Sequence, residues 1–532
     1  MTMATANNKR PQAAVIGAGF GGIAAAIRLQ AAGFETTIYE KRDMAGGRAY
    51  TYKDKGFTFD AGPTVVTAPQ TIEELFHLTG TSMQEYIELI KVDPLYRLFW
   101  EDGTVFNYTD DMTKTIEQMR KLNPEDAEGY KKFSAYAKEV FHEGYVKLGH
   151  VPFMSFWSML RCAPQLMKLQ AYRSVYSIVS KFIKSEHIRQ AFSFHTLLVG
   201  GNPFNTSAIY TLIHQLEKQW GVYFTKGGTG ALVSGLLKYF ESLGGKVVLN
   251  AEIDEIATSG GKATGLKLRN GTFAPADLVI SNAEVMHTYR KLLRSEPTAR
   301  KTERRLDRMS YSMSLFLIYF GTNKQWDNIA HHNVIFASRY KELLKEIFKN
   351  NKDRLPDDFS LYLHAPSKTD PSMAPPGKYA YYVLSPVAHL GNLDIDWAKE
   401  GPKYADRILG YLESRYMPGL RASIETQRIF TPKDFETELN SHLGAAFSIQ
   451  PVLQQSAYFR VHNRDDQISN LYFVGAGTHP GAGIPGVIGS AKATAGVILE
   501  DYKDILPKYR SGGAVAGGPQ QPMRSIFPEQ HV

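Results

Sequence analysis

The spacing of hydrophobic and polar positions changes several times along this chain. Residues 12–62 contain an apolar strand, a glycine turn, a helix with apolar positions at Ile23 and Ile27, a second strand and another glycine turn. Residues 71–200 have the spacing of a mostly helical segment. Short strands follow over 244–283 and 310–390, then a helix over 400–425. An apolar strand, a glycine-rich loop and a helix from about Val487 complete the pattern.

Apolar strands with glycine turns thus occur near both ends, which predicts an α/β fold with one nucleotide-binding domain assembled from both ends of the chain. We expect this discontinuous domain over 12–70, 225–300 and 460–505. Residues 71–224 would form a helical region, and residues 301–459 an inserted α+β substrate domain. The polar lead, 1–11, and the tail rich in Gly, Pro and Gln, 506–532, are expected to be disordered.

Composition narrows the class of protein. The 532 residues are 43% hydrophobic and 21% charged, as in globular proteins. The single cysteine, Cys162, excludes an intrachain disulfide and a four-cysteine zinc site, and no metal site is expected. The longest apolar run, 13–27, is too short to span a bilayer. The net charge of +8 comes from Lys and Arg scattered among acidic residues, which favours contact with an anionic membrane surface over nucleic acid.

The first glycine turn has the spacing G-x-G-x-x-G. Gly17 permits the tight turn, Gly19 lets the backbone approach a pyrophosphate, and Gly22 lets the following helix pack closely on the strand. Glu40 follows the second strand and lies where an acidic side chain accepts hydrogen bonds from ribose hydroxyls. This pattern predicts dinucleotide binding, without separating nicotinamide from flavin dinucleotides.

Two further glycine signals favour FAD. Gly46 and Gly47 precede Arg48, whose charge can neutralise a pyrophosphate, and this turn resembles the extended signature of the glutathione-reductase-like FAD fold. Near the other end, a glycine pair follows the strand 471–474, and a glycine–proline loop opens a helix whose free N–H groups can bind a flavin edge. The residues predicted at this second site are Gly475, Gly477, Gly486, Val487 and Ile488.

Together these motifs resemble the bacterial-type, lycopene-forming phytoene desaturases. The most specific stretches are GFTFDAGPTVVT (56–67), RQAFSFHTLLVGGNPF (189–204), GGTGALV (227–233) and LYFVGAGTHPGAGIPGVIGSAKA (471–493). The resemblance implies that the glycines above, Glu40 and Arg48 face FAD and that Val248 lies near the adenine. Many wider flavoprotein relatives have an acidic residue after the late glycine strand, where this chain has Thr478 and His479.

The resemblance further implies FAD-dependent dehydrogenation of 15-cis-phytoene, in about four steps, to lycopene in carotenoid biosynthesis. The substrate is a membrane-dissolved C40 hydrocarbon, so its site would be a long apolar channel. Oxygen or a quinone would be the electron acceptor. Alternatives are a desaturase that stops at neurosporene or ζ-carotene, a flavin-dependent carotenoid isomerase, a flavin amine oxidase, and a flavin-free prenyl-binding protein of the GDP-dissociation-inhibitor type.

Two histidines and one arginine are the residues considered for acid–base chemistry. His195 lies among apolar residues and has the surroundings of a buried structural histidine. His479 lies beside the late glycine loop and is a candidate base. Arg161 interrupts the apolar run FMSFWSMLRCAP; by resemblance it would act in the substrate channel as a catalytic residue, and otherwise its stem would reach solvent.

Aromatic and basic residues alternate with helical spacing between 153 and 183. This mixture suits an interfacial helix through which a membrane-dissolved hydrocarbon enters, and it equally suits a helix packed on the protein core. The first interpretation predicts a cytoplasmic protein bound peripherally to the inner face of the cell membrane.

Overall fold

A computed structural model describes residues 10–349 and 353–506. The predicted disordered lead and tail therefore lie almost wholly outside the described residues. At the N-terminal side Pro11 is already part of the fold, because its carbonyl accepts a hydrogen bond of 2.9 Å from the Glu35 N–H.

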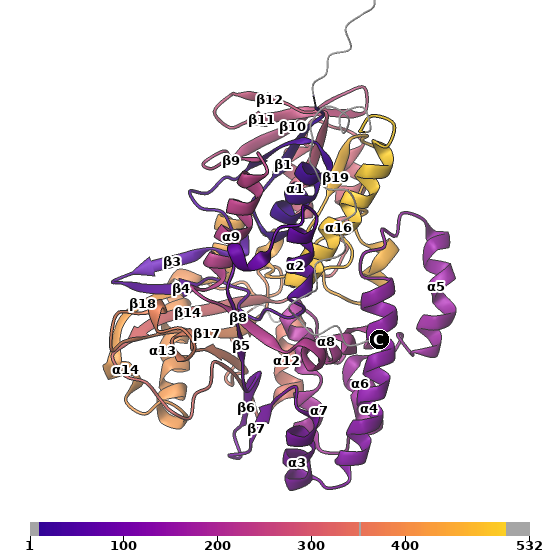
Figure 1. Ribbon diagram of the computed structural model, residues 1–532. Helices are drawn as coiled ribbons and strands as arrows, with labels where there is room; N and C mark the ends of the chain where they lie inside the picture. Colours follow the sequence, from indigo (N-terminus) through magenta and orange to yellow (C-terminus); the bar gives the residue numbers. More distant parts are fainter. Residues whose placement is uncertain (1–9, 350–352, 507–532) are drawn as a thin grey trace, which may run out of the picture.

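A five-stranded parallel sheet forms the upper part of the molecule (Figure 1). Its strands come from the start, the middle and the end of the chain, as expected for a domain assembled from distant segments. Two neighbouring interior strands, at 12–16 and 278–281, are buried on both faces, which explains their nearly continuous apolar sequences. In spatial order the strands are β19 (Leu471–Phe473), β13 (Leu278–Ser281), β1 (Gln12–Ile16), β2 (Glu35–Tyr39) and β9 (Lys246–Val248).

Helix α1 (Phe20–Ala32) lies in the interior of this domain. It packs against α16 (Ile484–Asp501) and α9 (Thr229–Ser242), so segments almost 500 positions apart are side by side. Its small residues Ala24, Ala25 and Ala26 are fully buried and permit close helix contacts. α2 (Gln70–His77) packs on both α1 and α16.

Three small antiparallel sheets flank the parallel sheet and connect it to the rest of the molecule. The outermost one has the order β10-β11-β12 and stands at the top of Figure 1. This sheet consists of β10 (Ile253–Ser259), β11 (Lys262–Leu268) and β12 (Phe273–Pro275). The second small sheet pairs β3 (Thr51–Asp54) with β4 (Phe57–Asp60), and the third pairs β5 (Leu89–Val92) with β8 (Val222–Thr225).

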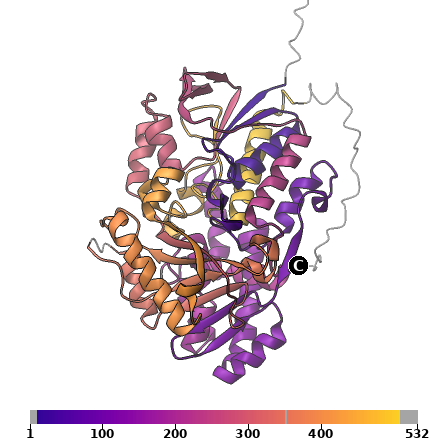
Figure 2. The same cartoon turned by 90° about the vertical axis from the view of Figure 1, so that its left-hand side faces the viewer.

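A seven-stranded sheet forms the second large layer, below the first in both views (Figures 1 and 2). Its strand pairs are antiparallel except for β15 with β6, which are parallel. In spatial order the strands are β18 (Ile424–Phe430), β14 (Ser314–Thr322), β17 (Tyr379–Val387), β16 (Leu361–His364), β15 (His332–Phe336), β6 (Tyr96–Trp100) and β7 (Val105–Tyr108).

The expectation of a mostly helical segment over 71–200 needs correction. Strands β5, β6 and β7 lie within it, and β6 and β7 extend the seven-stranded sheet. The buried sequence of β6, YRLFW, has no period that separates a strand from a helix. β6 pairs with β7 across a short turn at Gly103, a local hairpin that the sequence analysis missed, and with β15, which lies more than 200 positions away and joins the hairpin to the large sheet.

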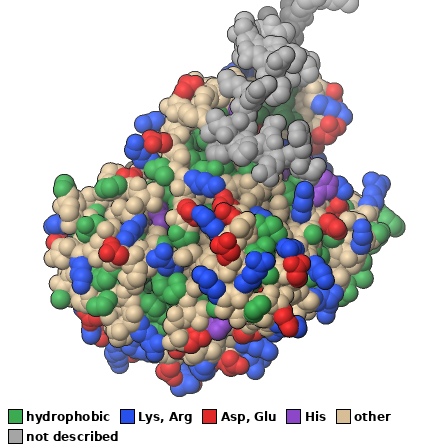
Figure 3. Space-filling model, turned by 60° about the horizontal axis from the view of Figure 1, so that its bottom comes forward, with side chains coloured by type: hydrophobic (Ala, Val, Ile, Leu, Met, Phe, Trp, Pro, Cys, Tyr) green, Lys and Arg blue, Asp and Glu red, His purple; other side chains and the backbone are tan. Residues whose placement is uncertain are grey.

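The remaining helices cover the sheets and form a separate layer on the right of Figure 1. In that layer are α3 (Met112–Leu122), α4 (Asp126–Phe141), α5 (Phe156–Lys168), α6 (Val175–Phe182), α7 (Glu186–Ala191) and α8 (Leu212–Trp220). The others are α10 (Val285–His287), α11 (Ala299–Asp307), α12 (Tyr340–Phe348), α13 (Trp397–Arg415), α14 (Leu420–Ser423) and α15 (Pro432–Leu439). No helix among the described residues has both the length and the apolar composition needed to cross a membrane. On the face shown in Figure 3, basic and acidic side chains are interspersed.

Candidate functional site

A cavity of about 790 Å³ lies between the two large layers and is lined by residues from both. At one end it meets the carboxyl ends of β1 and β2, where ligands bind in open α/β sheets. At the other end its walls are largely apolar. A single cavity thus connects the predicted nucleotide site with an apolar space.

The first glycine turn forms a close backbone cradle at the cavity wall. Gly17 has a φ of +92°, which favours glycine. A Cβ added at Gly22 would lie 2.1 Å from the Gly17 carbonyl oxygen, so no side chain fits there. α1 starts at Phe20, and its first N–H groups and positive dipole end suit a pyrophosphate. The tight turn expected at Gly17 and the close packing expected at Gly22 are both present.

Asn282, which the sequence analysis missed, packs against this cradle. A Cβ added at Gly19, Gly21 or Gly475 would lie within 2.6–2.9 Å of its side-chain amide atoms. Asn282 directly follows β13 and also lines the cavity. Its role depends on β13 lying next to β1, and no local sequence motif signals that pairing.

Glu40 lies at the carboxyl end of β2 and is 5% exposed. Its Oε2 accepts a 2.8 Å hydrogen bond from the Ala18 N–H, and its Oε1 accepts one of 3.0 Å from the Arg42 N–H. The Gly46 N–H in turn donates to the Ala18 carbonyl at 2.8 Å. The Gly46–Ala18 bond joins the two glycine turns, and the Glu40 carboxylate holds the first of them. The remaining lone pairs of the carboxylate can accept hydrogen bonds from a ribose.

Arg48 follows the second glycine turn and reaches into the cavity wall. One guanidinium nitrogen donates a 2.8 Å hydrogen bond to Ser441 Oγ, whereas the buried Nε has no hydrogen-bond partner among the described residues. Burial lowers the pKa of Arg48, and the nearby charge of Glu284 opposes that effect. An unpartnered buried donor on a cation suits an anionic or carbonyl-bearing ligand.

The late glycine loop closes the other side of the cradle. Gly475 has a φ of +105°, and a Cβ at Gly486 would lie 2.7 Å from the Gly481 carbonyl oxygen. Arg460, which is 1% exposed, supports this loop from behind by donating a 3.0 Å hydrogen bond to the Ala476 carbonyl. The first turn of α16, with Gly486, Val487 and Ile488, lies at the cavity wall. The Val487 N–H donates a 2.9 Å hydrogen bond to the Gly483 carbonyl, so the N–H that precedes the intrahelical bonds there is that of Gly486.

Most of the residues predicted to bind the cofactor line the cavity, and four predicted site residues do not. Gly22 and Gly477 are buried behind the cradle, where they permit close packing. Val248 is 39% exposed on the edge strand β9, and its carbonyl accepts a hydrogen bond from the Glu40 N–H. Arg161 is exposed on α5. The predicted cofactor-binding residues that line the cavity are Gly17, Gly19, Glu40, Gly46, Gly47, Arg48, Gly475, Gly486, Val487 and Ile488.

These features fit FAD. The cradle at Gly17–Gly22 leaves no space for added side chains, as close contact with a pyrophosphate requires, and Glu40 lines the same cavity at the carboxyl end of β2. Arg48 and the start of α16 then provide donors further along the same wall.

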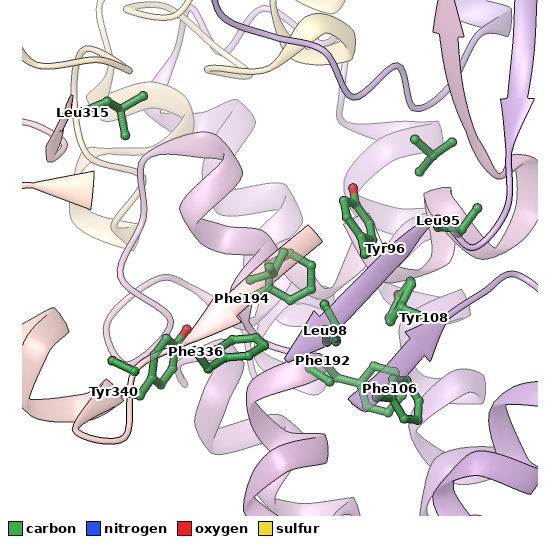
Figure 4. Close-up of a cluster of buried hydrophobic side chains, with 14 of the residues drawn as sticks. Leu95, Tyr96, Leu98, Phe106, Tyr108, Phe192, Phe194, Leu315, Phe336 and Tyr340 are labelled. Carbon is green, nitrogen blue, oxygen red and sulfur yellow. The ribbon is translucent and has the colours of Figure 1, made fainter. Parts of the chain in front are cut away.

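The apolar part of the cavity lies beyond the cradle, between the helical layer and the seven-stranded sheet. Phe194, Phe336 and Tyr340 lie in one buried cluster with edge-on ring contacts, and Leu315 lies at its far side (Figure 4). Further lining residues of this part are Leu197, Leu198, Val199, Ile209, Leu212, Ile213, Met313, Leu317, Val334, Leu361, Leu384, Phe430 and Phe435. Such a surface binds a ligand by apolar contact over its length.

One polar cluster reaches this cavity from the sheet side. The Thr64 hydroxyl lies 3.0 Å from the Tyr362 hydroxyl and 2.8 Å from that of Tyr382, and all three residues line the cavity. Tyr382 also donates to the carbonyl of Gly62, which packs against the Arg48 backbone. Burial raises the pKa of Tyr362 and of Tyr382, so both hydroxyls stay protonated at neutral pH.

Two histidines singled out by the sequence lie in different settings. His195 is 3% exposed, and its Nε2 lies 2.8 Å from Glu217 Oε2, whose side chain is fully buried. Tyr96 donates a 2.7 Å hydrogen bond to the same carboxylate. This arrangement matches a structural histidine. His479 instead lines the cavity and is partly exposed to it.

Three other histidines form a buried group outside the cavity lining. One ring nitrogen each of His331, His332 and His364 lies within 4.8 Å of the other two, which would suit a metal ion. In the observed arrangement the Nε2 atoms of His331 and His364 are 3.0 Å apart and share a hydrogen bond. His332 Nδ1 bonds the Tyr362 hydroxyl at 2.7 Å, so these side chains also support the polar cluster.

Helix α5 forms an outer wall of the cavity. Met159 and Leu166 on its inner side line the cavity, whereas Trp157 and Met167 on the opposite side are 71% and 60% exposed. No residue of α5 is fully buried, and the helix stands away from the body of the molecule in Figure 1. Arg161 shares the outer side with the exposed apolar residues.

The chain matches known proteins over most of its length. Residues 20–499 match the family model described as flavin containing amine oxidoreductase. A phytoene desaturase (lycopene-forming) from Pantoea ananas is 60% identical over 92% of this chain and 99% of its own length. A phytoene desaturase (neurosporene-forming) from Rhodobacter capsulatus is 42% identical over 93% and 95%.

Several solved structures have the same fold at 13–16% sequence identity. A cyclohexylamine oxidase from Brevibacterium oxydans has a TM-score of 0.58 at 14% identity, covering 93% of this chain and 100% of its own. At that level of identity the likeness concerns the fold alone.

Proposed function

Because the chain belongs to the flavin containing amine oxidoreductase family and, within it, to the phytoene desaturases, we propose that it converts 15-cis-phytoene to lycopene by four FAD-dependent dehydrogenations. The observation that carries this proposal is the single cavity that joins a dinucleotide cradle to a long apolar space. A hydrocarbon of this size offers no polar group, so its affinity has to come from buried apolar area, at about 25 cal/mol per Å².

The residues proposed to hold FAD follow the cavity wall. Gly17, Gly19 and the start of α1 would hold the pyrophosphate, and Glu40 the adenosine ribose. Arg48 and the first turn of α16 would contact the flavin end. When bound there, FAD supplies hydride-accepting chemistry. The chain's own contribution is an apolar wall that aligns the substrate.

Substrate entry is proposed to occur at α5 from a membrane. The helix has one face on the cavity and an apolar face on the surface, with basic residues beside it, as an interfacial helix does. This supports a peripheral position on the anionic inner face of the cell membrane. Oxygen or a membrane quinone is the proposed electron acceptor.

The proposal is tested by expressing the gene in a colourless bacterium that accumulates phytoene and recording the pigment spectrum. A red lycopene spectrum is expected. A yellow neurosporene or ζ-carotene spectrum would refute the four-step outcome, because those products need fewer dehydrogenations. Relatives named for these two products are 42% and 34% identical to this chain. Unchanged phytoene with a purified protein that carries FAD would refute the substrate assignment.

A flavin amine oxidase is the second candidate because solved amine oxidases have the same fold. It is tested by incubating the purified protein with primary amines and measuring hydrogen peroxide. The apolar walls of the cavity lead us to expect none.

A further inference from the structure

His479 lies in the loop between β19 and α16, and its imidazole forms part of the cavity wall near the start of α16. Its Nε2 lies 2.9 Å from the Leu148 carbonyl oxygen. A carbonyl oxygen only accepts hydrogen bonds, so Nε2 carries the proton and Nδ1 carries the lone pair. The Phe153 ring contacts the imidazole edge-on at 4.8 Å between centroids. These contacts fix both the tautomer and the ring orientation.

The surroundings keep this imidazole neutral. Burial lowers the pKa of His479 to about 4; the hydrogen bond to Leu148 opposes the shift, and the charges of Arg460 and His150 add to it. At the pH of a cell its Nδ1 is therefore unprotonated.

Carboxylates along the same cavity are engaged in other ways. Glu40 and Glu284 accept hydrogen bonds from backbone N–H groups. Glu217 accepts a 2.7 Å hydrogen bond from the Tyr96 hydroxyl, and its other oxygen lies 2.8 Å from His195 Nε2. Ion pairs with basic side chains hold the remaining ones: Glu74, Glu252 and Glu438.

We propose that Nδ1 of His479 accepts the proton that leaves the hydrocarbon, an inference that rests on the proposed function. With FAD in the cradle to accept the hydride that one carbon would lose, Nδ1 would take the proton that leaves the neighbouring carbon. The electrons of that second C–H bond form the new double bond. The imidazolium then returns its proton to water before the next step. Substrate and product are hydrocarbons and have no group of their own that can take this proton.

The test replaces His479 by Gln, whose amide nitrogen can occupy the Nε2 position and keep the bond to Leu148 without providing a basic lone pair. FAD content should be unchanged. The rate of flavin bleaching by phytoene in an anaerobic single turnover should fall about 100-fold or more, as expected for loss of a general base. A rate within threefold of the parent protein, at full FAD content, would overturn the proposal.

Chemical rescue separates a base from a structural support. In a His479→Ala variant, added imidazole should restore part of the bleaching rate, and restoration should increase from pH 6 to 8 as imidazole loses its proton. The Phe153→Leu variant loses the ring that supports His479 but keeps the base, so imidazole should not accelerate it. A His479→Ala protein that holds FAD and gains nothing from imidazole would contradict the proposal.

A measurement without turnover tests the same group. Deuterium exchange at the imidazole C2 position, followed by mass spectrometry in the FAD-free chain, should give a midpoint near 4 for His479. A midpoint above 6 would contradict its neutral, enclosed setting. If the parent protein itself fails to bleach with phytoene, the proposed function falls, which is a different result from failure of the His479 variants alone.

Discussion

Replacing Asp60 by Asn should stabilise the protein at alkaline pH. Asp60 ends β4, is 1% exposed, and accepts a 2.8 Å hydrogen bond on Oδ1 from the Thr229 N–H at the start of α9. Its Oδ2 is buried without a hydrogen-bond partner among the described residues. Burial raises the pKa of Asp60 to about 7, and hydrogen bonds from Thr229 and Gly230 offset only part of that effect.

The magnitude follows from the linkage between protonation and folding. The pKa rises from 3.8 in the unfolded chain to about 7 in the folded protein, so the folded state holds this proton more tightly. The resulting stabilisation is complete below pH 3.8 and is lost as the pH rises through 7. A pKa that rises from 3.8 to about 7 on folding corresponds to about 4 kcal/mol in the free energy of unfolding. The amide of the Asp60→Asn variant would resemble the protonated carboxyl and keep the Oδ1 bond. Because the amide does not titrate, the stability of the variant does not fall in this way as the pH rises.

The assay compares melting temperatures of both proteins, with saturating FAD, between pH 4 and 8.5. The Asp60→Asn variant should melt at a higher temperature at pH 8.5, and the difference should shrink towards pH 4. An Asp111→Asn variant makes the same change at the surface N-cap of α3 and serves as the control. A difference between the Asp60 variant and the parent that is independent of pH would refute the reasoning.

Three further predictions concern the cradle, the membrane face and Arg161. Gly22→Ala should abolish FAD retention, measured by the absorbance of the purified protein, whereas Gly496→Ala, with no atom near its added Cβ, should retain FAD. Trp157→Glu should reduce flotation with anionic liposomes, while Phe273→Glu, at a 50% exposed site on β12, should not. Arg161→Ala should keep full FAD content and turnover because the side chain is exposed outside the cavity lining; a loss of turnover alone would support the catalytic role predicted from the sequence.

Local signals in the sequence were sufficient for the nucleotide-binding part. The turn at Gly17 and the close packing at Gly22 depend on atoms within five positions of each other, so the spacing of glycines alone identifies them. The same holds for Gly46 and for the start of α16 near Gly486, where a glycine or proline is required by the local backbone. The strand–turn–helix order predicted from residue 12 onward was therefore correct.

Only the tertiary structure decided which distant residues share the cavity. Asn282 packs on the cradle because β13 pairs with β1, and the β6–β7 hairpin belongs to the seven-stranded sheet because β15 pairs with β6. His479 has a fixed tautomer because Leu148, 331 positions away, supplies a carbonyl oxygen. Each of these contacts joins segments whose local sequence patterns do not predict which distant segment they contact. Strand pairing and apolar burial bring such segments together, and their free energy depends on the whole packed arrangement rather than on any single stretch of sequence.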